Sequence, residues 1–315
     1  MSKVRVCFLG TPDIAVTCLS GMLADPHFEI VGVITQPEKP AGRKMQLTPT
    51  PVHTFAKSKS LNVISPPSVN TPEIQTQVGE WRAEVAVVVA FGQIVSPSFL
   101  DLFPQGCVNV HASLLPRWRG AAPIQRAVQA GDKVTGVCLQ KMVKKLDAGD
   151  VIGSREFPIN DEITALELLD EMGRLGVQLL RIDLMDYLRG NLIPTVQNES
   201  LVTYAKKIEK TESEIKWAES GLWIHNTVRA LTMGPGTWTL WAGQKIKIHK
   251  TRLTSLGLSS SVPPGSLHAE GSQLFVKTAD AWLEILELQP ESRNRQNAAE
   301  FLRGQPLQKS ARFGA

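Results

Sequence analysis

The chain has 315 residues, of which 43% are hydrophobic and 20% charged, and its formal net charge is +4. This length allows about two domains with a core each, and the balance of apolar and charged residues excludes a disordered or fibrous protein. The charge is uneven, since residues 1–203 hold 19 basic and 20 acidic side chains and residues 204–315 hold 15 and 10. So small a bias usually reflects a solvated surface, and by itself it only leaves nucleic acid open as a partner.

No apolar run approaches the ~18 residues that a membrane-spanning helix needs, and the chain enters a short strand at once, without the pattern of a signal peptide. The four cysteines stand singly in or beside apolar runs; they are Cys7, Cys18, Cys107 and Cys138. We interpret them as buried thiols in a reducing compartment. The sequence therefore predicts a cytoplasmic protein that does not enter a membrane.

Short β-branched runs alternate with helix-like stretches in the first half of the chain. Strands are predicted over Val4–Gly10, Glu29–Thr35, Val85–Ala90, Gly106–His111, Val134–Lys141 and Val151–Pro158. Helices are predicted over Pro12–Leu23, Val52–Lys59, Pro72–Trp81 and Gly120–Gln129. This alternation is typical of a parallel sheet covered on both faces. We therefore predict a doubly wound α/β domain with a mostly parallel, Rossmann-like sheet.

A long amphipathic pattern closes this part of the chain. It predicts a helix over Thr164–Arg189, with Gly190 as its stop. The polar stretch that follows is interrupted by Pro194, which indicates a linker.

The last third has a different pattern, with one helix and then short strand-like pieces separated by Gly, Pro and Ser. The helix is predicted over Ser220–Leu231, and the strands over Gly236–Ala242, Gln244–Leu253, Gly265–Ala269, Gln273–Ala279 and Ala281–Pro290. Many short strands with turn signals are typical of a small β-barrel. We predict an α/β domain over residues 1–189, a linker over 190–207 and a C-terminal β-barrel domain over 208–315.

The best-known nucleotide and metal motifs are absent from the sequence. The turn after the first strand has Gly10 but no G-x-G-x-x-G, so a tight turn with Pro12 opening the helix explains it better than a pyrophosphate site. The six histidines have no metal-ligand spacing; they are residues 27, 53, 111, 225, 249 and 268. We expect no metal site.

Asn109 and His111 stand two residues apart in a predicted strand, so their side chains project from the same face. They lie at the carboxyl end of that strand, where open α/β sheets bind ligands. Asp147 follows the next strand, in a loop that contains glycine. An amide donor, an imidazole and a carboxylate suit the attack of an amine on a carbonyl. A polar pair that caps a turn and an ordinary turn aspartate explain the same residues equally well.

The stretch "NVHASLLP" from Asn109, followed by "DAGD" from Asp147, resembles the folate-dependent formyltransferases. The continuation "RWRGAAPIQ" resembles specifically the members of that family that act on methionyl-tRNA, as do "TQPEKPAGR" from Thr35 and "LVTYAKKIEK" from Leu201. The likeness covers nearly the whole chain.

This resemblance implies that a formyl group passes from 10-formyltetrahydrofolate to the α-amino group of methionyl-initiator tRNA. Asn109 and His111 would stabilise the oxyanion and handle protons, and Asp147 would orient the histidine or a water molecule. The resemblance also implies a folate site lined by Ser113, Leu114, Leu115 and Pro116. Without it, these four residues indicate only a rigid exit from the strand.

The loop Gln36–Pro51 has four prolines and the basic pair Arg43 and Lys44. Its composition alone indicates an inert surface loop. The resemblance implies that the loop reaches the acceptor end of tRNA, with Arg43 and Lys44 as contacts, and that the basic, OB-like C-terminal domain binds the tRNA backbone. Arg117, Trp118 and Arg119 could contact RNA or pack the loop over the folate site.

Other readings remain open at this point. Formyltransferases that act on a ribonucleotide or a sugar nucleotide, and formylfolate hydrolases, would share Asn109, His111 and Asp147 but would not need the basic loop and C-terminal domain. An RNA-binding protein with a vestigial enzyme domain is the alternative from another class. The expectation is a monomer with no metal, whose partners are initiator methionyl-tRNA and a tetrahydrofolate derivative.

Overall fold

The computed structural model describes residues 3–41, 45–255, 261–305, 307–308 and 310–314, and the chain divides into two compact units. Unit 1 consists of Met1–Pro123, Thr135–Phe157 and Leu169–Ala205. Unit 2 consists of Ile124–Val134, Pro158–Leu168 and Lys206–Ala315.

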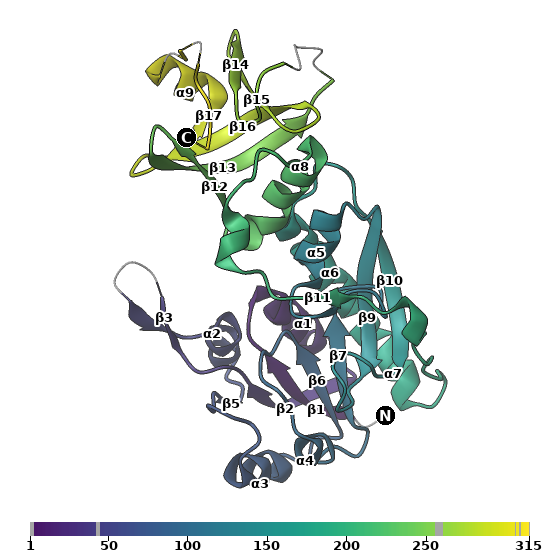
Figure 1. Ribbon diagram of the computed structural model, residues 1–315. Helices are drawn as coiled ribbons and strands as arrows, with labels where there is room; N and C mark the ends of the chain where they lie inside the picture. The colour runs from purple at the N-terminus through teal and green to yellow at the C-terminus, as the bar shows by residue number, and fades with distance from the viewer. Residues whose placement is uncertain (1–2, 42–44, 256–260, 306, 309, 315) are drawn as a thin grey trace. The chain divides into compact units, whose positions relative to one another are not determined.

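Unit 1 is built on a seven-stranded sheet with the order β10-β9-β7-β6-β1-β2-β5 (Figure 1). Its strands are β1 (Val4–Gly10), β2 (Phe28–Ile34), β5 (Val63–Ile64), β6 (Val85–Val89), β7 (Cys107–His111), β9 (Val134–Lys141) and β10 (Val151–Pro158). β1 pairs in parallel with β2 and β6, as do β2 with β5 and β6 with β7, whereas β7 and β9 are antiparallel. The predicted doubly wound, mostly parallel sheet is confirmed.

Helices cover both faces of this sheet. They are α1 (Asp13–Leu23), α2 (Pro51–Ser58), α3 (Pro72–Glu80), α4 (Pro97–Leu100), α6 (Ala165–Arg181), whose first four residues are assigned to unit 2, and α7 (Asp183–Leu188). The helix α5 (Pro123–Ala130) belongs to unit 2 from Ile124 on. Proline is tolerated in the first turn of a helix because the N–H it lacks has no partner inside the helix there. Accordingly, α2 and α4 each begin with proline behind a capping hydroxyl, from Thr50 and Ser96 respectively.

The sheet core follows from the alternation of apolar side chains. On one face, Leu9 and Val88 belong to a buried cluster with Val78 of α3 and Phe99 of α4. On the other face α6 approaches closely, because a Cβ on Gly176 would lie 3.0 Å from Val110 of β7. Strands buried on both faces explain the near-continuous runs of valine.

Two predicted helices differ from the structure. The predicted helix Thr164–Arg189 is interrupted at Ile182, between α6 and α7. The predicted helix Gly120–Gln129 begins only at Pro123, because β8 (Arg119–Gly120) pairs in parallel with β11 (Tyr204–Ala205). Propensity could not reveal this, since the pairing joins residues 85 positions apart.

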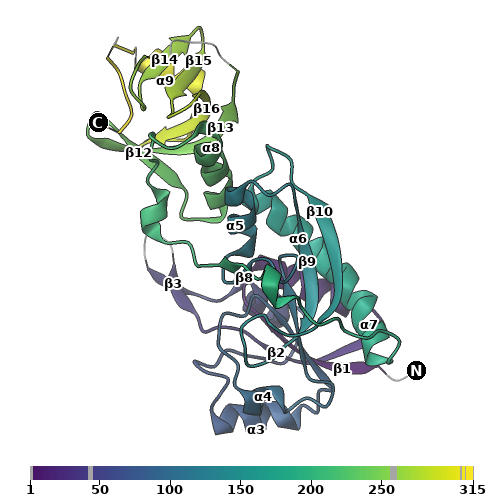
Figure 2. The ribbon, with the colours of Figure 1, turned by 45° about the vertical axis from the view of Figure 1, so that its right-hand side comes forward.

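Residues 190–205 belong to unit 1 and contain the 3₁₀ turn Glu199–Leu201 as well as β11. Figure 2 shows this segment running past β8 and β9. In the proline-rich loop, β3 (Lys39–Ala41) and β4 (Gln46–Thr48) form an antiparallel pair. Arg43 and Lys44 lie outside the described residues.

Unit 2 contains a six-stranded sheet with antiparallel pairing and the order β12-β13-β16-β15-β14, with β17 beside β16. Its strands are β12 (Thr237–Trp241), β13 (Gln244–Leu253), β14 (Leu267–Glu270), β15 (Gln273–Lys277), β16 (Trp282–Pro290) and β17 (Gln296–Asn297). The helix α8 (Gly221–Ala230) precedes the sheet and α9 (Ala298–Gly304) follows it, with further 3₁₀ turns at Lys210–Ser213 and Leu231–Met233. The predicted small C-terminal β domain is confirmed.

The core of unit 2 combines both helices with the inward-facing side of the sheet. Ile224 of α8 and Phe301 of α9 belong to one buried cluster with Ile246 and Leu283. The helix α9 has no counterpart in the prediction. It has only seven residues and begins with a capping box between Asn297 and Glu300, and this box is the main sequence signal for the helix. No helix of the described residues is both long and apolar enough to cross a membrane.

Candidate active site

Asn109 and His111 occupy the carboxyl end of β7. Val110 between them faces α6, so their side chains point to the opposite face of the sheet. His111 is buried and Asn109 is half-buried. The neighbouring antiparallel strand β9 places Gln140 directly opposite Asn109. The candidate pair thus stands on a strand rather than on a loop.

Asp147 lies in the loop between β9 and β10, and its carboxylate approaches the histidine. Its Oδ1 is 3.8 Å from Nδ1 of His111, and both side chains are almost completely buried. Its Oδ2 accepts a hydrogen bond of 2.8 Å from the backbone N–H of Gly120, and its Oδ1 accepts one of 3.1 Å from Nε2 of Gln140. Two donors thus orient the carboxylate beside the imidazole.

The tautomer of His111 follows from its other nitrogen. Nε2 lies 3.0 Å from the backbone carbonyl oxygen of Trp118, which can only accept, so Nε2 must carry the proton in that bond. In the neutral ring, Nδ1 therefore presents its lone pair on the side of Asp147. An imidazole held in this way can take a proton at Nδ1, and the adjacent carboxylate stabilises the resulting cation.

Gln140 and the Gly120 N–H are partners of Asp147 that the sequence did not suggest. A backbone N–H has no sequence signal, and Gln140 becomes visible only through the register between β7 and β9. The register would follow if the two predicted strands were known to be antiparallel neighbours. The sequence pattern does not distinguish antiparallel from parallel pairing.

The four residues expected to line a folate site divide into two kinds. Leu114, Leu115 and Pro116 line a cavity of about 490 Å³ in unit 1, together with Cys138, five residues of β10 and residues 195–198. The remaining residue, Ser113, is fully buried, and its hydroxyl donates to the carbonyl oxygen of Arg117 at 2.7 Å. Ser113 therefore holds the turn that presents the other three to the cavity.

The cationic and aromatic residues after this turn also differ from one another. The guanidinium of Arg117 lies over the Trp118 ring, 4.5 Å from its centroid. Arg119 has no exposed surface, and it donates to Oε1 of Gln197 through Nε and one terminal nitrogen. Arg119 is thus a buried part of the loop rather than a surface for RNA.

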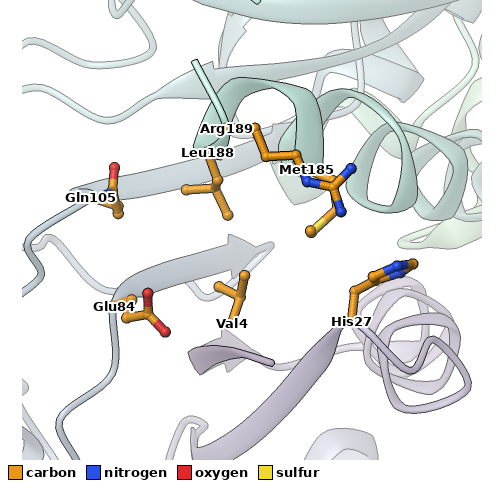
Figure 3. Close-up of a pocket in the computed structure, with 7 residues that line it drawn as sticks. All are labelled: Val4, His27, Glu84, Gln105, Met185, Leu188 and Arg189. Carbon is orange, nitrogen blue, oxygen red and sulfur yellow. The ribbon is translucent and has the colours of Figure 1, made fainter. Parts of the chain in front are cut away.

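A separate pocket of about 160 Å³ lies where the parallel strands of the sheet begin, away from the carboxyl end of β7 (Figure 3). It is lined by Val4, His27, Glu84, Gln105, Met185, Leu188 and Arg189. The first four of these stand at or just before the amino ends of β1, β2, β6 and β7, whereas His111 ends β7 at its carboxyl end. This pocket is therefore not part of the candidate active site. Within the described ranges, no group of three or more His, Cys, Asp or Glu side chains could hold a metal ion.

Comparison with known proteins gives consistent matches along the chain. A family model described as formyl transferase matches residues 3–181, and one described as the formyl transferase C-terminal domain matches residues 207–306. The chain is 54% identical to a methionyl-tRNA formyltransferase of Bdellovibrio bacteriovorus, and the match covers all of both chains.

Solved structures show the same fold at low sequence identity. An N-formyltransferase from Helicobacter canadensis, in complex with folinic acid and dTDP-3-aminofucose, matches with a TM-score of 0.68 at 20% identity, covering 91% of this chain and 99% of that one. HypX from Aquifex aeolicus, in complex with tetrahydrofolic acid, matches with a TM-score of 0.62 at 17% identity. That match covers 96% of this chain and 47% of HypX, so the chain spans about half the length of HypX.

Proposed function

The chain belongs to the methionyl-tRNA formyltransferase family, and from this premise we propose that it transfers the formyl group of 10-formyltetrahydrofolate to the α-amino group of methionyl-initiator tRNA. The product, formylmethionyl-tRNA, serves translation initiation. The observation that carries this function is the 54% identity that covers the whole of both chains. Matches to both formyl transferase family models, in chain order, agree with it.

The reaction makes three demands on the protein. The neutral amine attacks the formyl carbon, the carbonyl oxygen becomes an oxyanion in a tetrahedral intermediate, and N10 of the folate must take a proton as the bond from carbon to N10 breaks. A preorganised donor aimed at the oxyanion and a group that accepts and returns one proton meet these demands.

In our proposal Asn109 donates its amide N–H to the oxyanion and His111 handles the proton. Nδ1 of His111 accepts a proton from the attacking amine and delivers one to N10, so the enzyme ends in its starting state. Asp147 stabilises the imidazolium that exists between the two transfers, or orients a water molecule that carries the proton. The distance of 3.8 Å between Nδ1 and the carboxylate supports this division of roles.

The substrate contacts are proposed on the same basis. Leu114, Leu115 and Pro116 would line the folate site, with Ser113 as the residue that holds their turn, and the cavity that they border supports this. Arg43 and Lys44 would contact the acceptor end of tRNA.

We propose the same division of labour along the chain as the sequence suggests: a catalytic domain over residues 1–189, a linker over 190–207 and a tRNA-binding domain over 208–315. Exposed cations on β13 support the last assignment. Along that strand Lys245, Lys247 and Lys250 face solvent, whereas Ile246 and Ile248 are buried. We further propose a monomer that acts in the cytoplasm.

A panel of acceptors tests the function directly. The full-length chain is incubated with 10-formyltetrahydrofolate and with charged initiator methionyl-tRNA, free methionine, a phosphoribosyl amine or an amino sugar nucleotide, and formylated product is measured. We expect formylation of methionyl-tRNA alone. Formylation of a sugar nucleotide or a ribonucleotide instead would assign the chain to another formyltransferase reaction, and release of formate without an acceptor would indicate a hydrolase.

A further inference from the structure

We propose that Gln197 is a positioning residue for the reaction, which holds the Asp147 loop in the conformation that brings the carboxylate to His111. The inference rests on the proposed function, in which Asp147 acts on His111. Gln197 comes from the stretch after α7, where the sequence predicts only a linker, and it is 50 residues away from Asp147 in the chain.

The loop that carries Asp147 needs an external support. Asp147 has a φ of +47°, in the left-handed region that side chains with a Cβ rarely adopt. Two residues later, a Cβ on Gly149 would lie 1.8 Å from the carbonyl oxygen of Lys141, so the chain turns there at a distance that only glycine allows. Such conformations persist only where the surroundings hold them.

Gln197 supplies that support through one amide nitrogen. Its Nε2 donates to the carbonyl oxygen of Asp147 at 2.9 Å and to that of Gly149 at 2.6 Å. The side chain is buried, so these carbonyls have no water to replace it at that position. One nitrogen with two protons thus fastens the loop on both sides of its turn.

The orientation of the amide is determined from its other end. Nε and one terminal nitrogen of Arg119 donate to Oε1 of Gln197, at 3.1 and 2.8 Å. An amide with its oxygen between two guanidinium donors must direct its NH₂ group to the loop. This gives the buried Arg119 a role that the sequence left open.

The same amide also reaches the second donor of Asp147. Nε2 of Gln197 also lies 3.4 Å from Oε1 of Gln140, a long contact between two buried side chains that shares one of the two protons already directed to the loop carbonyls. With its oxygen turned to Gln197, Gln140 directs its own NH₂ group to the Asp147 carboxylate. Gln197 therefore supports both the backbone of Asp147 and the orientation of its carboxylate partner.

The test replaces Gln197 by leucine, which has a similar volume and no donor, and by asparagine, which keeps the amide but is one methylene too short. Steady-state formylation by each full-length variant is compared with that of the wild type, per folded molecule, with methionyl-tRNA and 10-formyltetrahydrofolate varied in turn. Gln178→Leu is the matched control, because it makes the same replacement at an exposed position of α6.

We expect kcat of Gln197→Leu to fall about tenfold to a hundredfold, since small misplacements of catalytic groups have effects of this size. The KM for methionyl-tRNA should stay within about threefold, and kcat of the asparagine variant should also fall by fivefold or more. A residue that only stabilises the fold would lower the melting temperature without lowering kcat per folded molecule.

A fall in kcat of less than about fivefold in both variants would overturn the inference, as would a rise in the KM for methionyl-tRNA or for the folate with kcat unchanged, the latter because Gln197 also lines the cavity proposed for the folate. The wild type in the same assay separates this outcome from a failure of the proposed function. If the wild type formylates methionyl-tRNA and the Gln197 variants equal it, the function stands and the positioning role does not. If the wild type does not formylate methionyl-tRNA, the function itself fails.

Discussion

Asp147, the proposed partner of His111, is oriented by residues that have no proposed part in the chemistry. Its carboxylate accepts from Gly120 and Gln140, and these two bonds leave it facing Nδ1 of His111. Asparagine has the same size, but its NH₂ group would meet one of the two donors. It would also provide no negative charge for the imidazolium.

We therefore expect Asp147→Asn to lower kcat by about a hundredfold to ten-thousandfold while the fold is kept, because general acid–base groups contribute on this scale. The measurement is kcat of the purified variant with methionyl-tRNA, together with its melting temperature. Asp170→Asn, at an exposed position of α6, is the control. Turnover above about a tenth of the wild-type value would rule out a role for Asp147 in proton handling.

At the scale of an element, α8 is anchored by a buried histidine. His225 lies with Nδ1 2.9 Å from the hydroxyl of Thr251 on β13, and its Nε2 donates to the carbonyl oxygen of Asp161 at 2.7 Å. Burial lowers the pKa of His225 below its ordinary value, and the nearby Arg229 adds to this, against the opposing effect of Asp161 and Glu162. Both ring nitrogens of the neutral form are used.

This anchor predicts a loss of stability in weak acid. As the pH falls below about 6.5, the imidazole in the unfolded chain takes a proton before the buried one does, so the free energy of unfolding decreases, at most by about 1.4 kcal/mol per pH unit. His225→Gln should remove this part of the pH dependence, so wild type and variant should converge as the pH is lowered from 7.5 towards 5. Denaturant unfolding of the wild type and of His225→Gln at several pH values measures the two free energies of unfolding.

The control for this prediction is the same replacement at His268, which is partly exposed on β14. If the difference in unfolding free energy between wild type and His225→Gln stays constant across this pH range, the anchoring of α8 does not depend on a neutral His225.

At the scale of the whole molecule, the net charge differs between the first two thirds of the sequence and the last third. Residues 1–203 are nearly neutral, whereas residues 204–315 carry five more basic than acidic side chains. On β13 part of this excess is displayed on one side, because alternate residues of a strand face opposite ways and the apolar ones are buried. Such a surface suits a phosphate backbone.

We expect the affinity for methionyl-tRNA to fall as salt rises, with the logarithm of the association constant decreasing by roughly 0.7–0.9 per phosphate neutralised for each unit of log salt concentration. Replacing Lys247 and Lys250 together by alanine should make this slope shallower by roughly one to two units, whereas Lys3→Ala, at an exposed position before β1, should not. Titrations of tRNA at several salt concentrations measure it. A flat response in the wild type would remove residues 208–315 from the interface.

The sequence by itself determined the class of the fold and the family. Alternating buried strands and helices have periods that local side chains set, so strands such as Val134–Lys141 and Val151–Pro158 could be predicted to their ends. Asn109, His111 and Asp147 could be named as candidates because strand spacing and family motifs are also properties of short stretches. The roles of these three residues stay predictions.

Only the tertiary structure decided how that site is held together. Because β8 pairs with β11, α5 begins three residues later than predicted. The register between β7 and β9 brings Gln140 to Asp147. Gln197 contacts the Asp147 loop from 50 residues further along the chain, and Arg119 in turn contacts Gln197. The residues that flank Gln197 and Arg119 in the sequence do not indicate these contacts. Hydrogen bonds between buried groups depend on which segments the fold brings within about 3 Å, and that distance is a property of the assembled core rather than of any local pattern.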